Sequence, residues 1–227
     1  MQKIFIALLL IIIAPWSATY AQTHYSSKFA IGGKAGITLS KMSFSPGVKQ
    51  SMIMGKTAGV SIRYWEEKNF GLIAELNFEQ RGWKENFEEY PFAFERQLDY
   101  IQLPLLTHIF FGNNKIKGFV NLGPEIGYMI GHRASANFDY NDISNIDDFP
   151  TNRMTEQMTL EPTNKFDYGI SGGAGVEFIL KRKHMFNLEA RYYFGIGNIF
   201  PDDRRDTFSA SRGMSILITL GYSYRLK

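Results

Sequence analysis

The sequence predicts an all-β protein, an eight-stranded antiparallel up-and-down transmembrane β-barrel. Three observations lead to this prediction: eight segments alternate apolar and polar residues, the connections between them are alternately long and short, and the N-terminus resembles an export signal. The segments are 29–40, 56–65, 70–83, 99–111, 117–130, 167–180, 185–196 and 213–226. Each is long enough to cross a bilayer, because a tilted transmembrane strand needs about 9–11 residues.

The alternation separates the strands into an apolar face and a charged face. In segment 70–83, for example, Leu72, Ala74, Leu76 and Phe78 alternate with Glu75, Asn77, Glu79 and Arg81. A charged side chain that faces lipid at the bilayer midplane costs about 2–4 kcal/mol. We therefore expect the lumen to hold the charged face, whose five basic and six acidic residues can neutralise one another: Lys34, Arg63, Arg81, Arg191, Arg225, Glu75, Glu79, Glu125, Asp167, Glu177 and Glu189.

The connections support the same topology. The short ones are 66–69, 112–116 and 181–184, and the long ones are 41–55, 84–98, 131–166 and 197–212. Outer-membrane barrels have short periplasmic turns and long extracellular loops. With an even number of strands and both termini in the periplasm, every short connection falls on the periplasmic side.

The N-terminus has the three parts of a secretory signal peptide. Lys3 supplies a positive charge, residues 4–14 form an unbroken apolar run, and small residues at positions 19 and 21 suit a signal peptidase. The apolar run is too short for a spanning helix, which needs about 20 residues. We expect residues 1–21 to be a cleaved signal peptide and residues 22–227 to be an outer-membrane β-barrel domain.

Two further features of the strands carry structural expectations. Aromatic residues near the segment ends suggest the two interfacial girdles of a membrane barrel: Tyr64, Trp65, Phe70, Trp83, Phe110, Phe111, Tyr192, Tyr193, Phe194, Tyr222 and Tyr224. Pro104 and Pro124 lie inside predicted strands, and proline cannot donate a hydrogen bond to a sheet. We expect a bulge or a lost hydrogen bond at each proline, and a soluble fold with edge strands there is the competing interpretation.

Composition excludes several classes of function. The 25 basic and 22 acidic residues give a net charge of only +3, which does not favour a nucleic-acid partner. The absence of cysteine excludes disulfides, thiolate metal sites and the acylated cysteine of a lipoprotein anchor. The length of 227 residues suits a single domain.

Candidate chemistry is sparse. The four histidines, His24, His108, His132 and His184, do not follow a zinc-binding spacing, and we expect His108 to be a hydrogen-bonding residue of the lumen. A Ser–His–acid site would require His132, Ser135 and Asp139 to converge. The third long loop carries four carboxylates that could bind calcium, those of Asp139, Asp142, Asp147 and Asp148. Their spacing does not match a calcium loop, because Ile143 falls where a ligand would be needed. We therefore expect no catalytic, cofactor-binding or metal-binding residue, and no cofactor.

Four stretches resemble the PorT-like family of small outer-membrane β-barrels: residues 75–82, 100–105, 118–125 and 169–177. The likeness spans about 29–226 and places both prolines where that family tends to place them. It implies the barrel fold and does not specify the role, because the family is broad. The namesake of the family is associated with a secretion apparatus. The C-terminus is also typical of a signal for the barrel-assembly machinery, with Thr219, Gly221, Tyr224 and Leu226 in place and Lys227 as one extra residue.

These observations favour a barrel with a filled lumen, because the interior of eight strands is just wide enough for side chains. We expect a structural, accessory or secretion-associated envelope protein that acts through its extracellular loops. The third long loop, 131–166, is the first choice for a contact surface because it is rich in Asp, Asn and aromatic residues such as Phe138, Tyr140 and Phe149.

The expected partners are outer-membrane lipid, the barrel-assembly machinery during insertion, and another envelope protein or a polysaccharide, with no nucleic acid. The alternative is a small porin-like channel. An outer-membrane enzyme ranks third, and a lipocalin-like secreted binder, which needs an apolar interior, ranks fourth.

Overall fold

The computed structural model describes residues 28–65, 67–88, 90–201, 203 and 205–226, so the expected signal peptide lies outside the described residues. Over the described part, the chain forms nine strands and two short helical segments. The strands are β1 (Lys28–Ser45), β2 (Gln50–Ser51), β3 (Ile53–Trp65), β4 (Phe70–Glu85), β5 (Phe94–Gly112), β6 (Ile116–Ala136), β7 (Phe166–Leu180), β8 (His184–Asn198) and β9 (Ala210–Arg225). The helical segments are η1 (Ile143–Asn145) and α2 (Glu156–Thr159).

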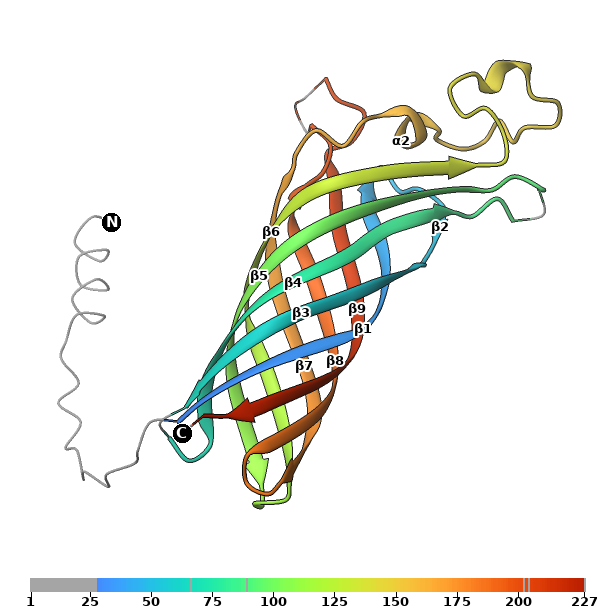
Figure 1. The fold of residues 1–227 in the computed structure, drawn as a ribbon. Helices are drawn as coiled ribbons and strands as arrows, with labels where there is room; N and C mark the ends of the chain where they lie inside the picture. Colours follow the sequence, from blue (N-terminus) through green and yellow to red (C-terminus); the bar gives the residue numbers. More distant parts are fainter. Residues whose placement is uncertain (1–27, 66, 89, 202, 204, 227) are drawn as a thin grey trace, which may run out of the picture.

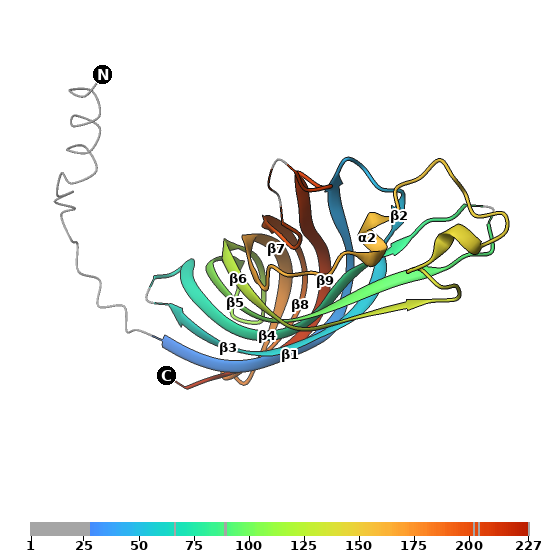
Figure 2. The same cartoon turned by 90° about the horizontal axis from the view of Figure 1, so that it is seen from above.

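Eight of these strands close into a barrel (Figures 1 and 2). Each pairs antiparallel with the strand that follows it in the ring, and β1 pairs with β9 from Ala30–Arg225 to Ser45–Ala210 to complete the closure. The two-residue strand β2 lies outside the ring and pairs only with the end of β4. The predicted eight-stranded antiparallel up-and-down barrel is confirmed. None of the described helices is long and apolar enough to cross a membrane.

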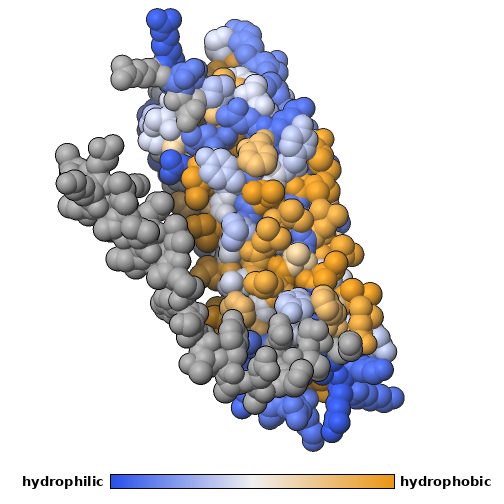
Figure 3. Space-filling view, turned by 90° about the vertical axis from the view of Figure 1, so that its left-hand side faces the viewer, coloured by the Kyte–Doolittle hydropathy of each residue, from blue (hydrophilic) through white to orange (hydrophobic). Residues whose placement is uncertain are grey.

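The two faces of the strands are separated as the alternation predicts. The Leu76 side chain is 51% exposed on the outer wall, whereas its neighbour Glu75 is 5% exposed inside the barrel. The outer wall carries a broad belt of apolar side chains, with hydrophilic residues above and below it (Figure 3). The lumen therefore holds the charged face, because a neighbouring position along a strand points to the opposite side.

The strands are longer than predicted at the end that carries the long connections, called here the long-loop end. β6, for instance, runs to Ala136 instead of residue 130, and it continues to pair with β5 as far as Phe94–Ala136. In this extension the outward residues are polar, such as Ser43 and Glu95, and the inward residues Phe44 and Phe94 are buried and apolar. The alternation of lipid-facing residues thus ends before the hydrogen-bonded strands end, which explains why the predicted strands are too short.

The prediction of a girdle is wrong for four of the aromatic residues. Trp65, Trp83, Phe110 and Tyr193 are buried inside the barrel. Each lies two residues from a lumen-facing polar residue on its own strand, so the period of two directs its ring inward. Other aromatic side chains of the expected girdles are exposed on the outer wall, namely Phe70, Phe111, Tyr192, Phe194 and Tyr222.

Both strand prolines interrupt pairing, as predicted. The β4–β5 register proceeds from Ala74–Leu105 directly to Asn77–Gln102 and so skips Pro104. The β5–β6 register proceeds from Thr107–Leu122 to Pro104–Glu125 and so skips Pro124. Each interruption is local, because a proline lacks the N–H that the ladder requires. The β5–β6 ladder also shifts register between Asp99 and Tyr100, which pair with Gly131 and Met129 and skip Ile130 of β6.

Two apolar clusters fill the ends of the barrel. The long-loop cluster contains Met42, Phe44, Trp83, Phe87, Phe94, Leu98, Tyr100, Met129, Met158, Ile199, Phe200 and Phe208. The short-turn cluster, at the opposite end, contains Ala30, Trp65, Phe110, Phe119, Ile179 and Met185. The charged face occupies the space between them.

Candidate functional site: the barrel interior and its loop cap

The central carboxylate of the interior is Glu75 on β4. It accepts hydrogen bonds from Lys34 Nζ on β1 at 2.5 Å and from Arg191 Nη1 on β8 at 2.7 Å. Arg191 also donates to Glu189 on its own strand, at 2.9 Å. Because β4 and β8 lie on opposite sides of the ring, the contact between Glu75 and Arg191 crosses the lumen.

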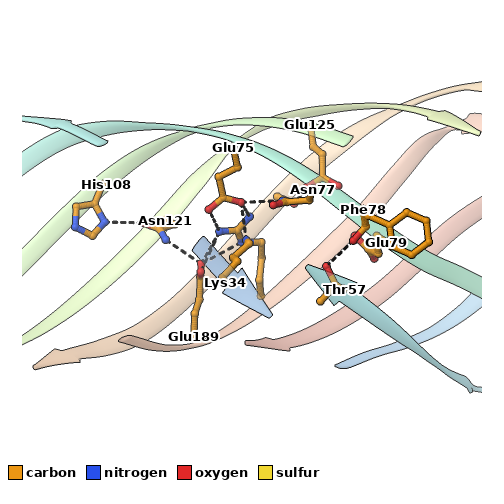
Figure 4. Close-up of polar contacts among 12 residues, drawn as sticks. Lys34, Thr57, Glu75, Asn77, Phe78, Glu79, His108, Asn121, Glu125 and Glu189 are labelled. Atoms are coloured by element: carbon orange, nitrogen blue, oxygen red, sulfur yellow. Dashed lines mark hydrogen bonds and ion pairs between the residues drawn. The ribbon is translucent and has the colours of Figure 1, made fainter. Parts of the chain in front are cut away.

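This network continues toward the short-turn end. Asn121 donates to Glu189 at 2.8 Å, and its side-chain oxygen lies 2.7 Å from Nδ1 of His108 (Figure 4). The His108 ring also packs between Phe110 and Phe119 of the short-turn cluster, with ring centroids 5.1 and 5.2 Å away. The predicted role of His108 as a hydrogen-bonding residue of the lumen is confirmed.

A second network surrounds Arg81, nearer the long-loop end. Its guanidinium contacts Glu79 at 2.8 Å, Glu125 at 2.8 Å and Asp167 at 3.0 Å. The Tyr193 ring covers the guanidinium at 3.7 Å, and the hydroxyl of Tyr193 donates to Asp167 at 2.8 Å. One cation is thus shared by three carboxylates from three strands, which ties β4, β6 and β7 together across the interior.

These contacts fill the middle of the barrel with side chains. Glu75, Glu79, Arg81 and Arg191 are each at most 5% exposed. Apart from these two networks, an ion pair between Arg63 and Glu177 joins β3 to β7 next to the short-turn cluster. Buried charges require partners because their desolvation is costly, and each of these has at least one. The arrangement is a packed, hydrogen-bonded interior, as the narrow lumen of an eight-stranded barrel allows.

The long-loop end is closed by the third long connection. In this connection α2 places Met158 fully inside the long-loop cluster, and Gln157 is equally buried. Arg96 on β5 donates to the backbone carbonyls of Met158, at 2.7 Å, and of Leu160. Figures 1 and 2 show α2 lying over the mouth of the barrel. Part of the expected contact loop is therefore a cap on the barrel.

Glu85 is the second anchor of this cap. Its carboxylate accepts hydrogen bonds from Arg153 at 2.7 Å and from Gln157 at 3.1 Å, both in the third connection. It also accepts one from the indole of Trp83 at 3.2 Å. Sequence analysis did not identify Glu85, although it shares the strand parity of the lumen residues Glu79 and Arg81.

The aromatic residues of the third connection pack within the molecule. Phe138 and Phe149 join Phe87 and Phe92 of the second connection in a four-ring cluster whose centroids are all 5.2–6.0 Å apart. Tyr140 packs against Phe94 at 5.3 Å. The rings of Phe138, Tyr140 and Phe149 are half-buried and hold the two loops together, so they contribute less contact surface than the sequence suggested.

The exposed part of the third connection is an acidic lobe, defined here as residues 139–148. It carries Asp139, Asp142, Asp147 and Asp148 and no basic residue. The lobe includes η1 and projects sideways beyond β6 at the long-loop end (Figure 1). It begins and ends at the four-ring cluster, because Phe138 and Phe149 flank it.

The structure does not assemble the residues of the suggested Ser–His–acid site. His132 and Ser135 lie three positions apart on β6, so their side chains point to opposite faces of the strand. Nε2 of His132 lies 3.2 Å from Glu161 instead. His184 lies at the start of β8, with Nδ1 2.9 Å from the Tyr222 hydroxyl, and His24 lies outside the described residues.

The carboxylates of the acidic lobe shape local turns. Asp142 accepts hydrogen bonds from Ser144 at 2.5 Å and Asn145 at 2.8 Å, and these bonds lower the pKa of its carboxyl group. Asp139 accepts one from the backbone N–H of Asn141 at 3.0 Å. Within the described part of the chain, no three histidine or carboxylate side chains are grouped so that they could hold a metal ion.

Comparison with known proteins identifies the family to which this fold belongs. A family model described as an outer membrane protein β-barrel domain matches residues 20–201, which is most of the chain. The chain belongs to this family of outer membrane β-barrel proteins. This outer membrane β-barrel protein is located in the bacterial outer membrane, and by the topology of such barrels its long-loop end is extracellular and its short-turn end is periplasmic. None of the curated proteins matches this chain.

Several solved structures share the fold of this outer membrane β-barrel protein. OprG from Pseudomonas aeruginosa is 13% identical with a TM-score of 0.51, and the alignment covers 89% of this chain and 97% of OprG. Neisserial surface protein A is 14% identical with a TM-score of 0.45, covering 88% and 98% of the two chains. Ail of Yersinia pestis is 11% identical with a TM-score of 0.43, covering 88% and 99%. At such identities the likeness concerns the fold alone.

Proposed function

We propose that this protein is a non-enzymatic, non-conducting barrel that serves as a structural, accessory or secretion-associated envelope protein through its extracellular loops. The observation that carries the proposal is the continuous filling of the lumen. The short-turn cluster, the Glu75 and Arg81 networks and the long-loop cluster follow one another along the axis, and α2 covers the mouth. A scaffold of this kind presents loops on a rigid support.

We assign the contact surface to the acidic lobe. The segment that follows it is occupied with closing the barrel, because Arg153 and Gln157 bind Glu85 and Met158 is buried. The lobe has four aspartates, so a partner with basic or hydrogen-bonding groups would suit it, either another envelope protein or a polysaccharide. The expected contacts with outer-membrane lipid and the barrel-assembly machinery belong to the same proposal.

The finer family assignment is also a proposal. The PorT-like resemblance and the association of that family's namesake with a secretion apparatus favour a secretion-associated role. The same experiment that identifies a partner of the acidic lobe would test this role, because a component of a secretion apparatus would then be recovered with the protein.

The decisive experiment replaces residues 141–148 of the acidic lobe with a short Gly-Ser linker and keeps Tyr140, which packs against Phe94. The rings of Phe138 and Phe149, on either side of the lobe, are 5.6 Å apart, so a short linker can join the two sides without displacing the cap. Deleting the whole predicted loop, 131–166, would instead remove the end of β6 and Met158. A matched variant with the four aspartates changed to asparagine keeps the length of the lobe and removes its charge.

The readout is a cross-linked pull-down from intact envelopes, with heat-modifiability on gels as the check of assembly. We expect both variants to assemble and to lose the association that the unaltered protein shows. An association that survives the linker replacement would contradict the assignment of the lobe. Planar-bilayer recordings test the closed lumen: steady, large conductance from the purified monomer would favour the porin-like channel instead.

A further inference from the structure

The periplasmic end of the barrel contains a basic cavity with a volume of about 430 Å³. It lies below the short-turn cluster, and Trp65, Phe110 and Ile179 of that cluster form part of its lining. Five cationic side chains line it, namely Lys28, Lys68, Lys117, Arg182 and Arg225. None of the described lining residues is acidic. We name this site the basic cup.

The cations of the basic cup come from distant parts of the chain. Lys28 begins β1, Lys117 lies near the start of β6 and Arg225 ends β9, whereas Lys68 and Arg182 lie in two different turns. Barrel closure brings five positive charges around one hollow, and their mutual repulsion opposes this arrangement. An anion in the cup would relieve that repulsion.

Carboxylates are arranged so that the cup remains electropositive. In the described part of the chain, no ion pair within 4.0 Å joins a carboxylate to Lys68, Lys117, Arg182 or Arg225. Glu177 is opposite Lys117 in the β6–β7 register, but its carboxylate is paired with Arg63 inside the barrel. Glu177 also attracts Lys117 through space, but one carboxylate that is already paired with Arg63 cannot offset the five cations that line the cup.

Aromatic rings position two of the cations. The ammonium of Lys117 lies 4.1 Å from the centroid of Phe110, and the guanidinium of Arg225 lies 5.3 Å from that of Trp65. Cation–π contacts of this kind restrain flexible side chains at the floor of the cup. The buried Nε of Arg225 has no hydrogen-bond partner, so the guanidinium retains donor capacity.

We propose that the basic cup binds a phosphate-bearing anion from the periplasmic side. Its volume falls within the range of small-ligand sites, about 300–1,000 Å³, and Lys and Arg are the side chains that recognise phosphate oxygens. The phosphate can belong to the headgroup of an anionic phospholipid in the inner leaflet or to a free small molecule. This proposal concerns the opposite end of the barrel from the acidic lobe and does not depend on it.

Two neighbouring residues provide a matched test. Arg182 lines the cup, whereas Lys181 lies in the same turn outside it, and both have positive φ angles, 60° and 49°. Changing each to glutamine removes the same charge from the same turn and imposes the same backbone demand. Lys117→Gln removes a second cation of the cup.

The probe is inorganic pyrophosphate, titrated against the purified mature protein in a zwitterionic detergent. In a Trp83→Phe background, Trp65 is the only tryptophan that remains after residue 21, so its fluorescence reports on the floor of the cup. We expect a saturable change in fluorescence. Arg182→Gln and Lys117→Gln should each weaken binding about tenfold, because charge-assisted hydrogen bonds are among the stronger ones. Lys181→Gln should leave binding nearly unchanged.

A competition arm distinguishes the two sources of phosphate. Short-chain phosphatidylglycerol that displaces pyrophosphate, when phosphatidylcholine of the same chain length does not, would identify a lipid headgroup as the ligand. Failure of both lipids to compete would indicate a free anion. The absence of saturable binding to the protein with an intact cup would overturn the proposal. Equal weakening of binding by Lys181→Gln and Arg182→Gln would also overturn it, because it would indicate diffuse surface charge. Heat-modifiability verifies that every variant is folded.

Discussion

Glu85 and Arg153 are 68 residues apart in the chain, yet Arg153 Nη2 donates to Glu85 Oε2 at 2.7 Å at the mouth of the barrel. The side chain of Glu85 is fully enclosed, and that of Arg153 is 7% exposed. The guanidinium of Arg153 also lies over the Phe87 ring, 4.0 Å from its centroid. The pair therefore joins the end of β4, the second connection and the third connection at one point.

Glu85→Gln should release the cap, because it removes the charge that holds Arg153 and also weakens the contact with Gln157. Breaking a buried ion pair typically costs about 3–5 kcal/mol, since one charge loses its partner. We expect trypsin to cleave after Arg153 in this variant and to spare it in the unaltered protein. Cleavage at the exposed Arg205 provides an internal standard, and Glu95→Gln, at an exposed position on β5, is the control variant. Equal resistance of Arg153 in all three proteins would show that Glu85 does not hold the cap.

Leu76→Arg should block assembly into the membrane. Leu76 is exposed on the outer wall, so the substitution places a charge in the apolar belt at a cost of about 2–4 kcal/mol near the midplane. Leu76→Ala removes the same side chain without adding a charge and should assemble normally. The measurement is the fraction of protein in the heat-modifiable, folded band after refolding into lipid vesicles. Efficient folding of Leu76→Arg would mean that this face does not contact lipid.

Arg191→Leu should destabilise the barrel by about 3–5 kcal/mol, because Glu75 and Glu189 each lose a buried partner. The double variant Glu75→Leu with Arg191→Leu should lose less stability than the sum of the two single variants. The unaltered network has two cations and two carboxylates, and the double variant keeps one of each, Lys34 and Glu189. Urea unfolding in detergent micelles measures the three values, and strict additivity would argue against the coupling across the lumen.

Gly82→Ala should destabilise the protein by about 1–3 kcal/mol. Gly82 has a φ of 152°, and a Cβ atom there would lie 1.9 Å from the carbonyl oxygen of Arg96 on β5. Its backbone N–H also donates to the hydroxyl of Ser40, at 2.9 Å. Gly131→Ala is the control, because a Cβ atom at Gly131 meets nothing within 4 Å. The same urea titration compares them, and a Gly82→Ala variant as stable as Gly131→Ala would contradict this account.

The wrong predictions have two different physical sources. The inward direction of Trp83 follows from the sequence, because Trp83 shares strand parity with Arg81, and a position near a segment end does not by itself place a ring on the outer wall. The burial of Met158 was not available in this way. Met158 lies within a long connection that has no periodicity, and its contacts with the long-loop cluster depend on how that connection returns to the barrel mouth.

By itself, the sequence determined the all-β class, the number of barrel strands and the side of each strand that faces lipid. These properties are local: successive side chains of a strand point to opposite sides, and lipid tolerates few charges, so the alternation of residues reveals both. Only the tertiary structure decided which charges meet, such as Glu75 with Arg191, and which cations gather in the basic cup. Those contacts depend on the register at which β1 and β9 close the ring, and no local pattern in the chain records that register.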